Sequence, residues 1–139
     1  MATAIFVPRT SVVTVNSVDL SDQVQSATLR YEVDALVTDT IASSAHTFGQ
    51  GLENNSCSIT FMMSYASSEP YATLKSLIGT TTTISIKPAA GSASATNPTQ
   101  VLTGAFLPGI DVYNASAGEL STITCEWVGG TYSEVTTGA

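Results

Sequence analysis

Apolar and polar residues alternate along two stretches of the chain. Between Val24 and Ile41, with Leu36 as an exception, apolar side chains recur at every second position: Leu29, Tyr31, Val33, Ala35 and Val37. A period of two predicts a long strand with one face on a core and the other facing solvent or a polar cavity. Residues 56–65 repeat the pattern, with an apolar face that consists of Cys57, Ile59, Phe61 and Met63. The sequence therefore predicts a well-patterned strand on each side of residues 42–55.

Shorter stretches rich in β-branched residues predict further strands. They span residues 4–15, with an interruption at Pro8, and then residues 80–87, 100–106, 110–114 and 120–128. Residues 16–19 have the composition of a turn between strands, because Asn and Asp side chains can bond back to their own backbone. These segments make the chain predominantly β in expectation.

Residues 69–78 are the one segment with a helical pattern. Its apolar residues would form a single stripe along the helix: Tyr71, Leu74, Leu77 and Ile78. Ser67 or Ser68 can cap the N-terminus, and Pro70 suits the first turn. Gly79 suits the position just after the end of the helix. We expect this helix to pack on the strands.

Residues 42–55 carry few apolar side chains that could anchor them to a core. Loops of this length inside a compact domain are uncommon and are usually functional or disordered. We expect an exposed arm here, and a short polar C-terminal tail from about residue 131. The order of elements predicts one domain over residues 1–139, an antiparallel β-sandwich or barrel with one flanking α-helix and an extended loop or hairpin arm.

The chain is acidic and poor in charge. Of its 139 residues, 11% are charged, four basic and eleven acidic, for a net charge of −7, whereas roughly 25% is usual for a soluble domain. Four cations cannot neutralise many phosphates, so we expect no nucleic-acid binding by counterion release. No apolar run approaches the ~20 residues of a transmembrane helix, and we find no secretory signal pattern. So few charges indicate a surface that other protein covers.

The residue types that most often perform chemistry form no catalytic pattern. Cys57 and Cys125 fall on apolar faces without a C-x-x-C spacing, so we interpret them as buried free thiols. His46 lies near Ser43 and Ser44, but no G-x-S-x-G motif accompanies it. An exposed arm is also poorly suited to hold a general base within reach of a nucleophile.

Glu32 and Asp34 are the carboxylate pair that we tested as a possible acid and base. Two positions apart on a strand, they would share a face about 7 Å apart, a spacing that could suit glycoside hydrolysis. The aromatic platform that a sugar needs is missing, because Trp127, the only tryptophan, falls with the apolar residues. We therefore expect an acidic solvated face, and no enzyme, metal site or cofactor site.

The second half of the chain carries an ordered set of short motifs. A helix that ends in Leu77-Ile-Gly-Thr80 precedes a strand that closes on Lys87-Pro88, and a Gly118-Glu-Leu-Ser-Thr122 turn leads into the final strand. This order resembles the tail tube (major tail) proteins of long-tailed bacteriophages. The resemblance covers nearly the whole chain, since the long strand and the arm lie where that family carries an extended hairpin.

The resemblance implies a structural virion protein. Six copies would form a ring, and stacked rings would form the tail tube through which DNA leaves the capsid without specific binding. The partners would be further copies of the chain and the tape measure, tail terminator and tip proteins, with no membrane partner and no cofactor. The location would be the virion tail, and the host cytoplasm during assembly.

Two sets of residues are candidates for assembly under this hypothesis. An acidic lumen would repel phosphate and let DNA slide, so the lumen or inter-ring candidates are Arg30, Glu32, Asp34 and Glu126. Arg30 could instead pair with an acidic neighbour across a subunit interface. The assembly arm candidates are His46, Phe48, Gly49, Gly51 and Leu52. The alternatives are another virion module, such as a capsid decoration protein or a fibre domain, and a carbohydrate-binding β-sandwich.

Overall fold

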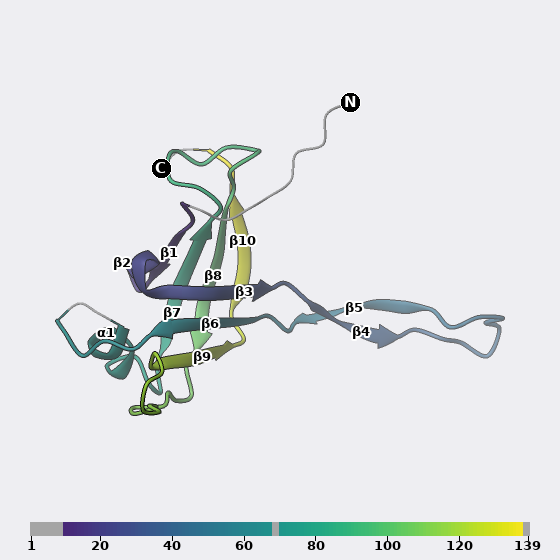
Figure 1. Cartoon of the computed structure of the whole chain (residues 1–139). Coiled ribbons are helices and arrows are strands. Elements are labelled where there is room, and N and C mark those ends of the chain that lie inside the picture. Colours follow the sequence, from purple (N-terminus) through teal and green to yellow (C-terminus); the bar gives the residue numbers. More distant parts are fainter. Residues whose placement is uncertain (1–9, 68–69, 138–139) are drawn as a thin grey trace.

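The computed structural model describes residues 10–67 and 70–137, and strands dominate it (Figure 1). Eight strands share one antiparallel sheet: β1 (Val12–Val15), β2 (Val18–Asp19), β3 (Val24–Arg30), β6 (Ser56–Met62), β7 (Thr81–Lys87), β8 (Thr99–Phe106), β9 (Thr122–Val128) and β10 (Thr131–Val135). A separate hairpin consists of β4 (Val33–Val37) and β5 (Phe48–Glu53). The described residues also form one α-helix and one 3-10 turn, α1 (Pro70–Lys75) and η1 (Ser21–Gln23). The predicted mainly β fold with a flanking helix and a hairpin arm is confirmed.

The sheet bends at β8 into two layers. Its strand order is β2-β1-β7-β8-β9-β6-β3, and β10 also pairs with β8. Strand β8 pairs with β10 over residues 99–103 and reaches β9 only where Phe106 lies opposite Val128. One layer therefore holds β2, β1, β7, β8 and β10, and the other holds β9, β6 and β3. The strands of the two layers cross one another in Figure 1, which gives a sandwich.

Glycines allow the chain to turn the corner between the layers. Gly104 of β8 has φ +77°, and Gly130, between β9 and β10, has φ +92°, angles that other residues rarely adopt. A Cβ on Gly130 would also lie 2.8 Å from the carbonyl oxygen of Thr103. Only glycine therefore lets β10 return against β8 at this point.

The two layers and α1 enclose one apolar core. Large and fully buried side chains come from both layers and from the helix: Trp127, Phe61, Ile59, Ile123, Ile84, Leu102 and Leu74. Burial alternates along β6, as its period of two predicts. Cys57 and Cys125 are free and buried, which confirms their interpretation as apolar residues. Burial raises the pKa of each thiol to about 12.

The helix is shorter than the predicted 69–78. It ends at Lys75, and Leu77 continues the buried stripe from the turn that follows. Gly79 has φ +79° and donates its N–H to a carbonyl of the loop between β8 and β9. Its left-handed backbone is the one predicted for the end of this element. Residues 68 and 69, predicted to favour the N-terminus of the helix, lie outside the described residues.

Three strand predictions need correction. The long strand predicted from Val24 to Ile41 ends at Val37 and is interrupted at residues 31–32, where the backbone of Glu32 bonds to Asn54 and to the side chain of Asn55 instead of continuing a ladder. Residues 110–114 form no strand and run along the surface. Residues 131–135, predicted as a polar tail, form β10, because the glycine corner returns them to β8. The predicted strand at residues 4–7 lies outside the described residues.

Candidate assembly surface

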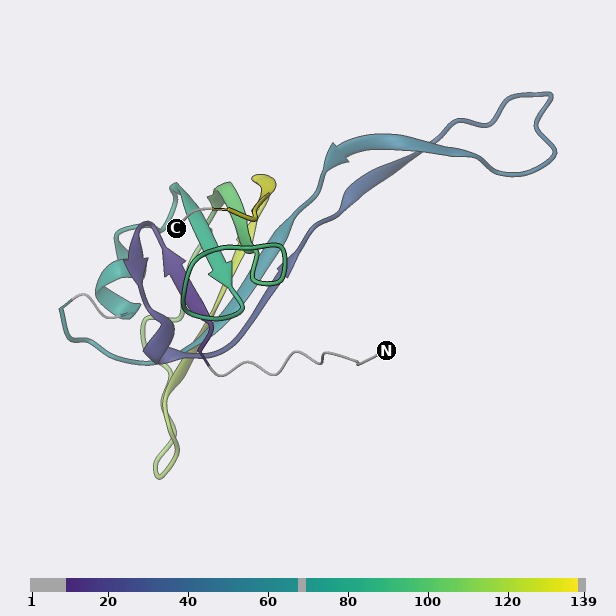
Figure 2. The same cartoon turned by 90° about the horizontal axis from the view of Figure 1, so that it is seen from above.

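Strands β4 and β5 form a hairpin that projects far from the sandwich (Figures 1 and 2). It continues β3 and β6 outward, with Val33 opposite Glu53 and Val37 opposite Phe48. Among the described residues, these two strands pair only with each other. We call residues 33–53 the arm. The sequence predicted an arm at residues 42–55, but one of its two strands is β4, the outer part of the predicted long strand.

One face of the arm is apolar and exposed. Residues opposite each other in an antiparallel pair share a face, so Val37 and Phe48 lie side by side, and the alternation along β5 adds Leu52. Their exposed fractions are 66%, 62% and 82%. The prediction that this part of the strand lies on a core is therefore wrong for the described chain. Two strands alone are at best marginally stable in water, so the uncovered apolar face makes the arm a candidate interaction surface.

The other face of the arm is packed closely over glycine. A Cβ on Gly51 would lie 3.0 Å from Cβ of Asp34 and 3.2 Å from Cγ of Leu36. A Cβ on Gly49 would lie 3.1 Å from Cγ2 of Thr38. These distances are shorter than ordinary van der Waals contact. The two glycines, predicted as arm candidates, thus let the β4 side chains lie over the β5 backbone.

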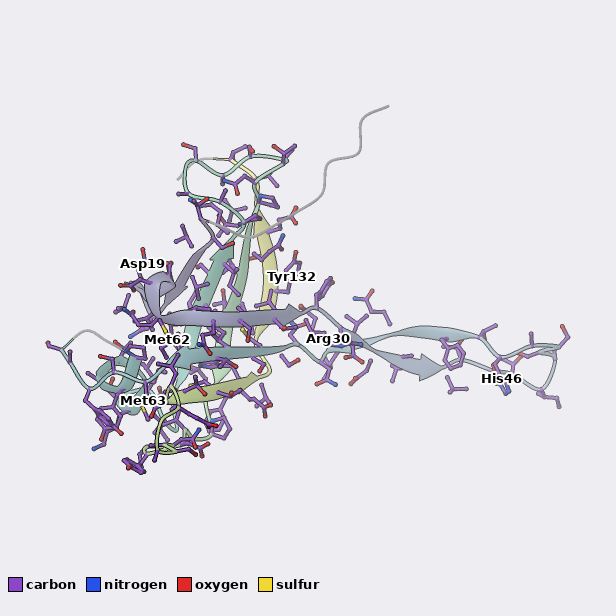
Figure 3. All side chains as sticks on the ribbon, in the orientation of Figure 1. Asp19, Arg30, His46, Met62, Met63 and Tyr132 are labelled. Carbon is purple, nitrogen blue, oxygen red and sulfur yellow. The ribbon has the colours of Figure 1, made fainter. Side chains whose placement is uncertain are left out.

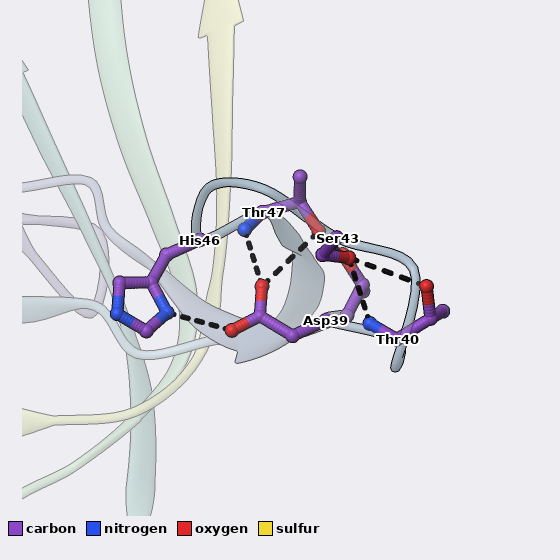
Figure 4. A network of polar contacts seen from close by, with 6 residues as sticks. Asp39, Thr40, Ser43, His46 and Thr47 are labelled. Carbon is purple, nitrogen blue, oxygen red and sulfur yellow. Dashed lines mark hydrogen bonds and ion pairs between the residues drawn. The ribbon is translucent and has the colours of Figure 1, made fainter.

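A polar network closes the tip of the arm (Figure 4). One oxygen of the Asp39 carboxylate lies 2.6 Å from Nδ1 of His46, and the other accepts the backbone N–H of Thr47 at 2.6 Å. The bond from Thr47 is the largest cause, and that from His46 the next, of a lowered pKa for Asp39. The Ser43 hydroxyl accepts the N–H of Thr40 at 2.8 Å. Because Ser43 bonds to this backbone and not to the imidazole, the network fixes a turn and forms no nucleophile–base pair.

Asn55 fastens the root of the arm to the sandwich. Its side chain is 1% exposed, and its carbonyl accepts the N–H of Glu32 at 3.0 Å. Its amide donates to Glu53 at 3.0 Å and to the carbonyl of Gly130 at 3.1 Å. Glu53 also accepts the backbone N–H of Tyr132, and these bonds, that from Asn55 first, lower the pKa of the Glu53 carboxyl. One buried amide therefore links both strands of the arm to the turn between β9 and β10.

An aromatic pair also connects the base of the arm to the sandwich. The rings of Tyr31 and Tyr132 stack with centroids 4.4 Å apart and an interplanar angle of 18°, and the Tyr132 hydroxyl donates to Gln100 on β8. Figure 3 shows Arg30 and Tyr132 near the root of the arm and His46 near its tip. Together with Asn55, the stack gives the arm a defined direction.

The outer face of the β3-β6-β9 layer carries mostly hydroxyl groups. Its cross-strand rows are Thr28–Ser58–Glu126 and Arg30–Ser56–Val128, and the next row along contains Thr60 and Thr124, whose hydroxyls are 3.1 Å apart. The four predicted lumen or inter-ring candidates are only partly brought together. Arg30 pairs with Glu32 of its own chain, Nε to Oε2 at 2.8 Å, whereas Glu126 lies two strands away and Asp34 lies on the arm.

A second exposed apolar patch lies beyond β6, in the segment that precedes the helix and in the loop between β8 and β9. It consists of Tyr65, Val112, Tyr113 and Leu120, all at least half exposed. The Tyr65 hydroxyl donates to the carbonyl of Val112 at 2.9 Å, which holds the two segments together. This end of the sandwich, with α1 and the β8–β9 loop, faces away from the arm in Figure 1. We call this set the loop patch.

Sequence reasoning missed the residues that orient the arm. The sequence placed Asn55 only at the end of the polar segment 42–55. Two adjacent asparagines between two alternating stretches are nevertheless a turn signal. The stack of Tyr31 on Tyr132 has no local signal, because the two residues are distant in sequence. Among residues 10–67 and 70–137, no group of three or more His, Cys, Asp or Glu side chains could hold a metal ion. No helix in that part of the chain is long and apolar enough to span a membrane.

Comparison with solved structures identifies the fold. The chain is similar to one in the extended-state sheath/tube terminator of an extracellular contractile injection system (PVC), with a TM-score of 0.69, 12% identity, and coverage of 96% of this chain and 99% of that one. It is similar to the SPP1 tail tube, with a TM-score of 0.69, 9% identity, and coverage of 91% and 76%. It is also similar to a chain in the virion of a native gene transfer agent, with a TM-score of 0.66, 10% identity, and coverage of 90% and 95%.

No family model and no curated protein matches the sequence. The structural matches nevertheless extend over nine tenths or more of the chain. The fold is therefore that of tail tube proteins, which confirms the fold that the sequence motifs implied.

Proposed function

We propose that this protein is a structural subunit of a tail tube. Copies of the chain form rings of six, and the rings stack into a conduit through which DNA is ejected. The observation that carries the proposal is the arm, which extends an apolar face into solvent without a partner among the described residues. The tail tube fold supports the same role, and the role is architectural rather than catalytic.

The arm and the loop patch supply two different surfaces for contact between copies. A ring or a stack requires heterologous contacts, in which one surface of a subunit binds a different surface of the next. The apolar face with Val37, Phe48 and Leu52 is one such surface, and the loop patch, on the other side of the sandwich, is a candidate for its receptor. The edges of β4 and β5 can also pair with a neighbouring sheet.

The outer face of the β3-β6-β9 layer is our candidate for the lumen wall. Its hydroxyl rows offer DNA neither a dense positive charge nor a large apolar surface. The Arg30–Glu32 ion pair cancels the one cation among the lumen or inter-ring candidates, which leaves Glu126 and Asp34 as unpaired anions within the described chain. Phosphate is then weakly repelled, and DNA slides without being held.

Partners and location follow from the same role. Each subunit would contact further copies of the chain along the tube. The tape measure protein would lie inside the tube, and the terminator and tip proteins would bind at its ends. It would be assembled in the host cytoplasm and reside in the virion tail. Structural neighbours from a sheath/tube terminator and a sheath-tube complex support partners of this kind.

Electron microscopy of concentrated protein tests the proposal. We expect annular particles or open tubes, and class averages of end views count the subunits in a ring. Phe48→Asp places a carboxylate on the apolar face of the arm and abolishes these assemblies, whereas Ser92→Asp, on an exposed loop, adds the same charge and leaves them intact. Monomers at every concentration of the wild-type protein contradict a tube subunit.

A further inference from the structure

A groove lies between the two layers of the sandwich, beside β3. It has a volume of about 240 Å³, and its lining is largely apolar: Ser11, Ala27, Leu29, Ile86, Pro88 and Gln100. Leu29 and Ile86 are only partly buried, although they pack against the core, and Ala27 is exposed. A hollow of similar size on the outer face of β1 and β7 is lined mostly by polar side chains, among them Thr14 and Ser85. The groove beside β3 therefore suits an aliphatic side chain better than that hollow does.

Ile41, at the tip of the arm, is the most exposed large apolar side chain in the described chain. Ile41 and Ala42 are the central residues of a turn. In this turn Ser43 donates its N–H to the carbonyl of Thr40 at 2.9 Å, and its hydroxyl accepts the N–H of Thr40 at 2.8 Å. Turn geometry favours Gly, Pro, Asn, Asp and Ser, so the turn itself does not require isoleucine. Because these bonds already order the tip, Ile41 can bind a partner at a low cost in entropy.

The charges near the two features are complementary between copies of the chain. The arm, residues 33–53, contains three carboxylates and neither Lys nor Arg. Lys87 lies between Ile86 and Pro88, two of the groove residues. An acidic arm is therefore attracted to the side of the sandwich that carries the groove. The arm projects away from its own sandwich (Figures 1 and 2), so its tip can reach this groove only in a second copy.

We propose that Ile41 of one copy inserts into the groove beside β3 of a second copy. Its side chain is then buried against Leu29 and Ile86, which the sandwich by itself leaves partly exposed. The tip and the groove are different surfaces, so the contact is heterologous and can repeat from one copy to the next. The inference rests on the proposed assembly of the chain and adds a contact to it, distinct from the one between the apolar face of the arm and the loop patch.

Cysteine cross-linking between two full-length variants tests the placement. One variant carries Ile41→Cys, and the other carries Ala27→Cys in the groove or, as the matched control, Thr28→Cys, which is also exposed but lies on the opposite face of β3. Cys57 and Cys125 stay in place, because burial raises the pKa of each thiol to about 12 and keeps them unreactive. In an equimolar mixture under mild oxidation, we expect the mixed disulfide to form about tenfold faster with Ala27→Cys than with Thr28→Cys. Equal rates overturn the proposal, and so does a faster reaction with Tyr113→Cys, since the tip then binds the loop patch.

Assembly of single variants gives a second measurement. Ile41→Ser removes the aliphatic side chain and is expected to raise the protein concentration needed for assembly about tenfold, whereas Ala42→Ser, in the same turn, leaves it unchanged. Ala27→Trp fills the groove and is expected to act as Ile41→Ser does. Both positions are exposed, so we expect a wild-type Tm for both variants. Assembly of Ile41→Ser at the wild-type concentration overturns this inference alone, whereas a wild-type chain that never self-associates contradicts the proposed function as well.

Discussion

Val37 on β4 lies directly opposite Phe48 on β5, and both side chains are more than half exposed on the arm. An apolar cross-strand pair stabilises a hairpin, but in this arm it rests on nothing else in the described chain. The same alternation that elsewhere buries a face against the core here leaves an apolar face exposed. The position of this pair makes the arm separable from the stability of the sandwich.

Removing the arm is therefore expected to prevent assembly without unfolding the protein. Val33 and Glu53 are cross-strand partners, so an Asn-Gly turn can join them in place of residues 34–52. The shortened chain keeps Asn55 and the whole core, and we expect a Tm within a few degrees of the wild-type value. If the wild-type chain polymerises as proposed, sedimentation velocity is expected to show monomers of the shortened chain at the same concentrations. Normal polymerisation, or failure to fold, contradicts this division between arm and sandwich.

Asn55→Ala is expected to destabilise the sandwich and loosen the arm. The substitution leaves the N–H of Glu32 and the carbonyl of Gly130 without their buried partner, and each such loss costs about 1–3 kcal/mol. We expect a fall of about 2–4 kcal/mol in the free energy of unfolding in urea. Asn54→Ala is the matched control, since Asn54 is exposed and contributes its backbone N–H to the same joint. A similar small loss from both variants would show that the side chain of Asn55 does not hold the arm.

The sequence was sufficient to predict the strands whose alternation is enforced by burial. Strand β6 has buried and half-buried residues in strict alternation, and Trp127 is buried among the apolar residues as its position predicts. For these strands, one face must meet a core, so the pattern and the structure agree. The apolar stripe of the helix is confirmed for the same reason, since Leu74 and Leu77 are buried.

The interruption between β3 and β4 was beyond such reasoning. Apolar residues continue at every second position through residue 37, because the arm needs the same period as a core strand. The break depends on the side chain of Asn55, 23 positions away, which accepts a hydrogen bond from the N–H of Glu32. No local pattern encodes that contact. Strand β10 was missed for a related reason, because its pairing with β8 depends on the conformation of Gly130 and on a close approach to Thr103. A period of two in the sequence predicts that one face of a strand is apolar, but it does not show whether that face is covered by the same chain.

The two cysteines give a test of the closed core. Burial raises the pKa of Cys57 and of Cys125 to about 12, so neither thiol forms a thiolate near neutral pH. A disulfide reagent at about pH 8, close to the ordinary thiol pKa, is expected to modify neither residue in the native protein and both residues in concentrated urea. Modification of one cysteine within minutes under native conditions would show that the layers open far more readily than the packing around Trp127 indicates.

The tip of the arm is expected to lose its order at low pH through Asp39. Its folded-state pKa lies below the ordinary value of 3.8, chiefly because the carboxylate accepts the N–H of Thr47 and then because it bonds His46. A lowered folded-state pKa contributes order that is present above the unfolded pKa and is lost as the pH falls through the folded value. The amide signal of Thr47, followed by NMR, should therefore stay constant at mildly acidic pH and move below about pH 4.

Asp39→Asn separates this effect from general acid unfolding. The amide oxygen can still accept the N–H of Thr47 but does not titrate, so the Thr47 signal should no longer change in that range while signals from β6 and β9 behave as in the wild-type protein. The exposed position of the network, with the His46 side chain 83% accessible, makes it a local element that can unfold without the sandwich. A Thr47 transition that persists unchanged in Asp39→Asn would assign the pH response to another group. It would also show that the Asp39 carboxylate does not hold the tip in its folded conformation.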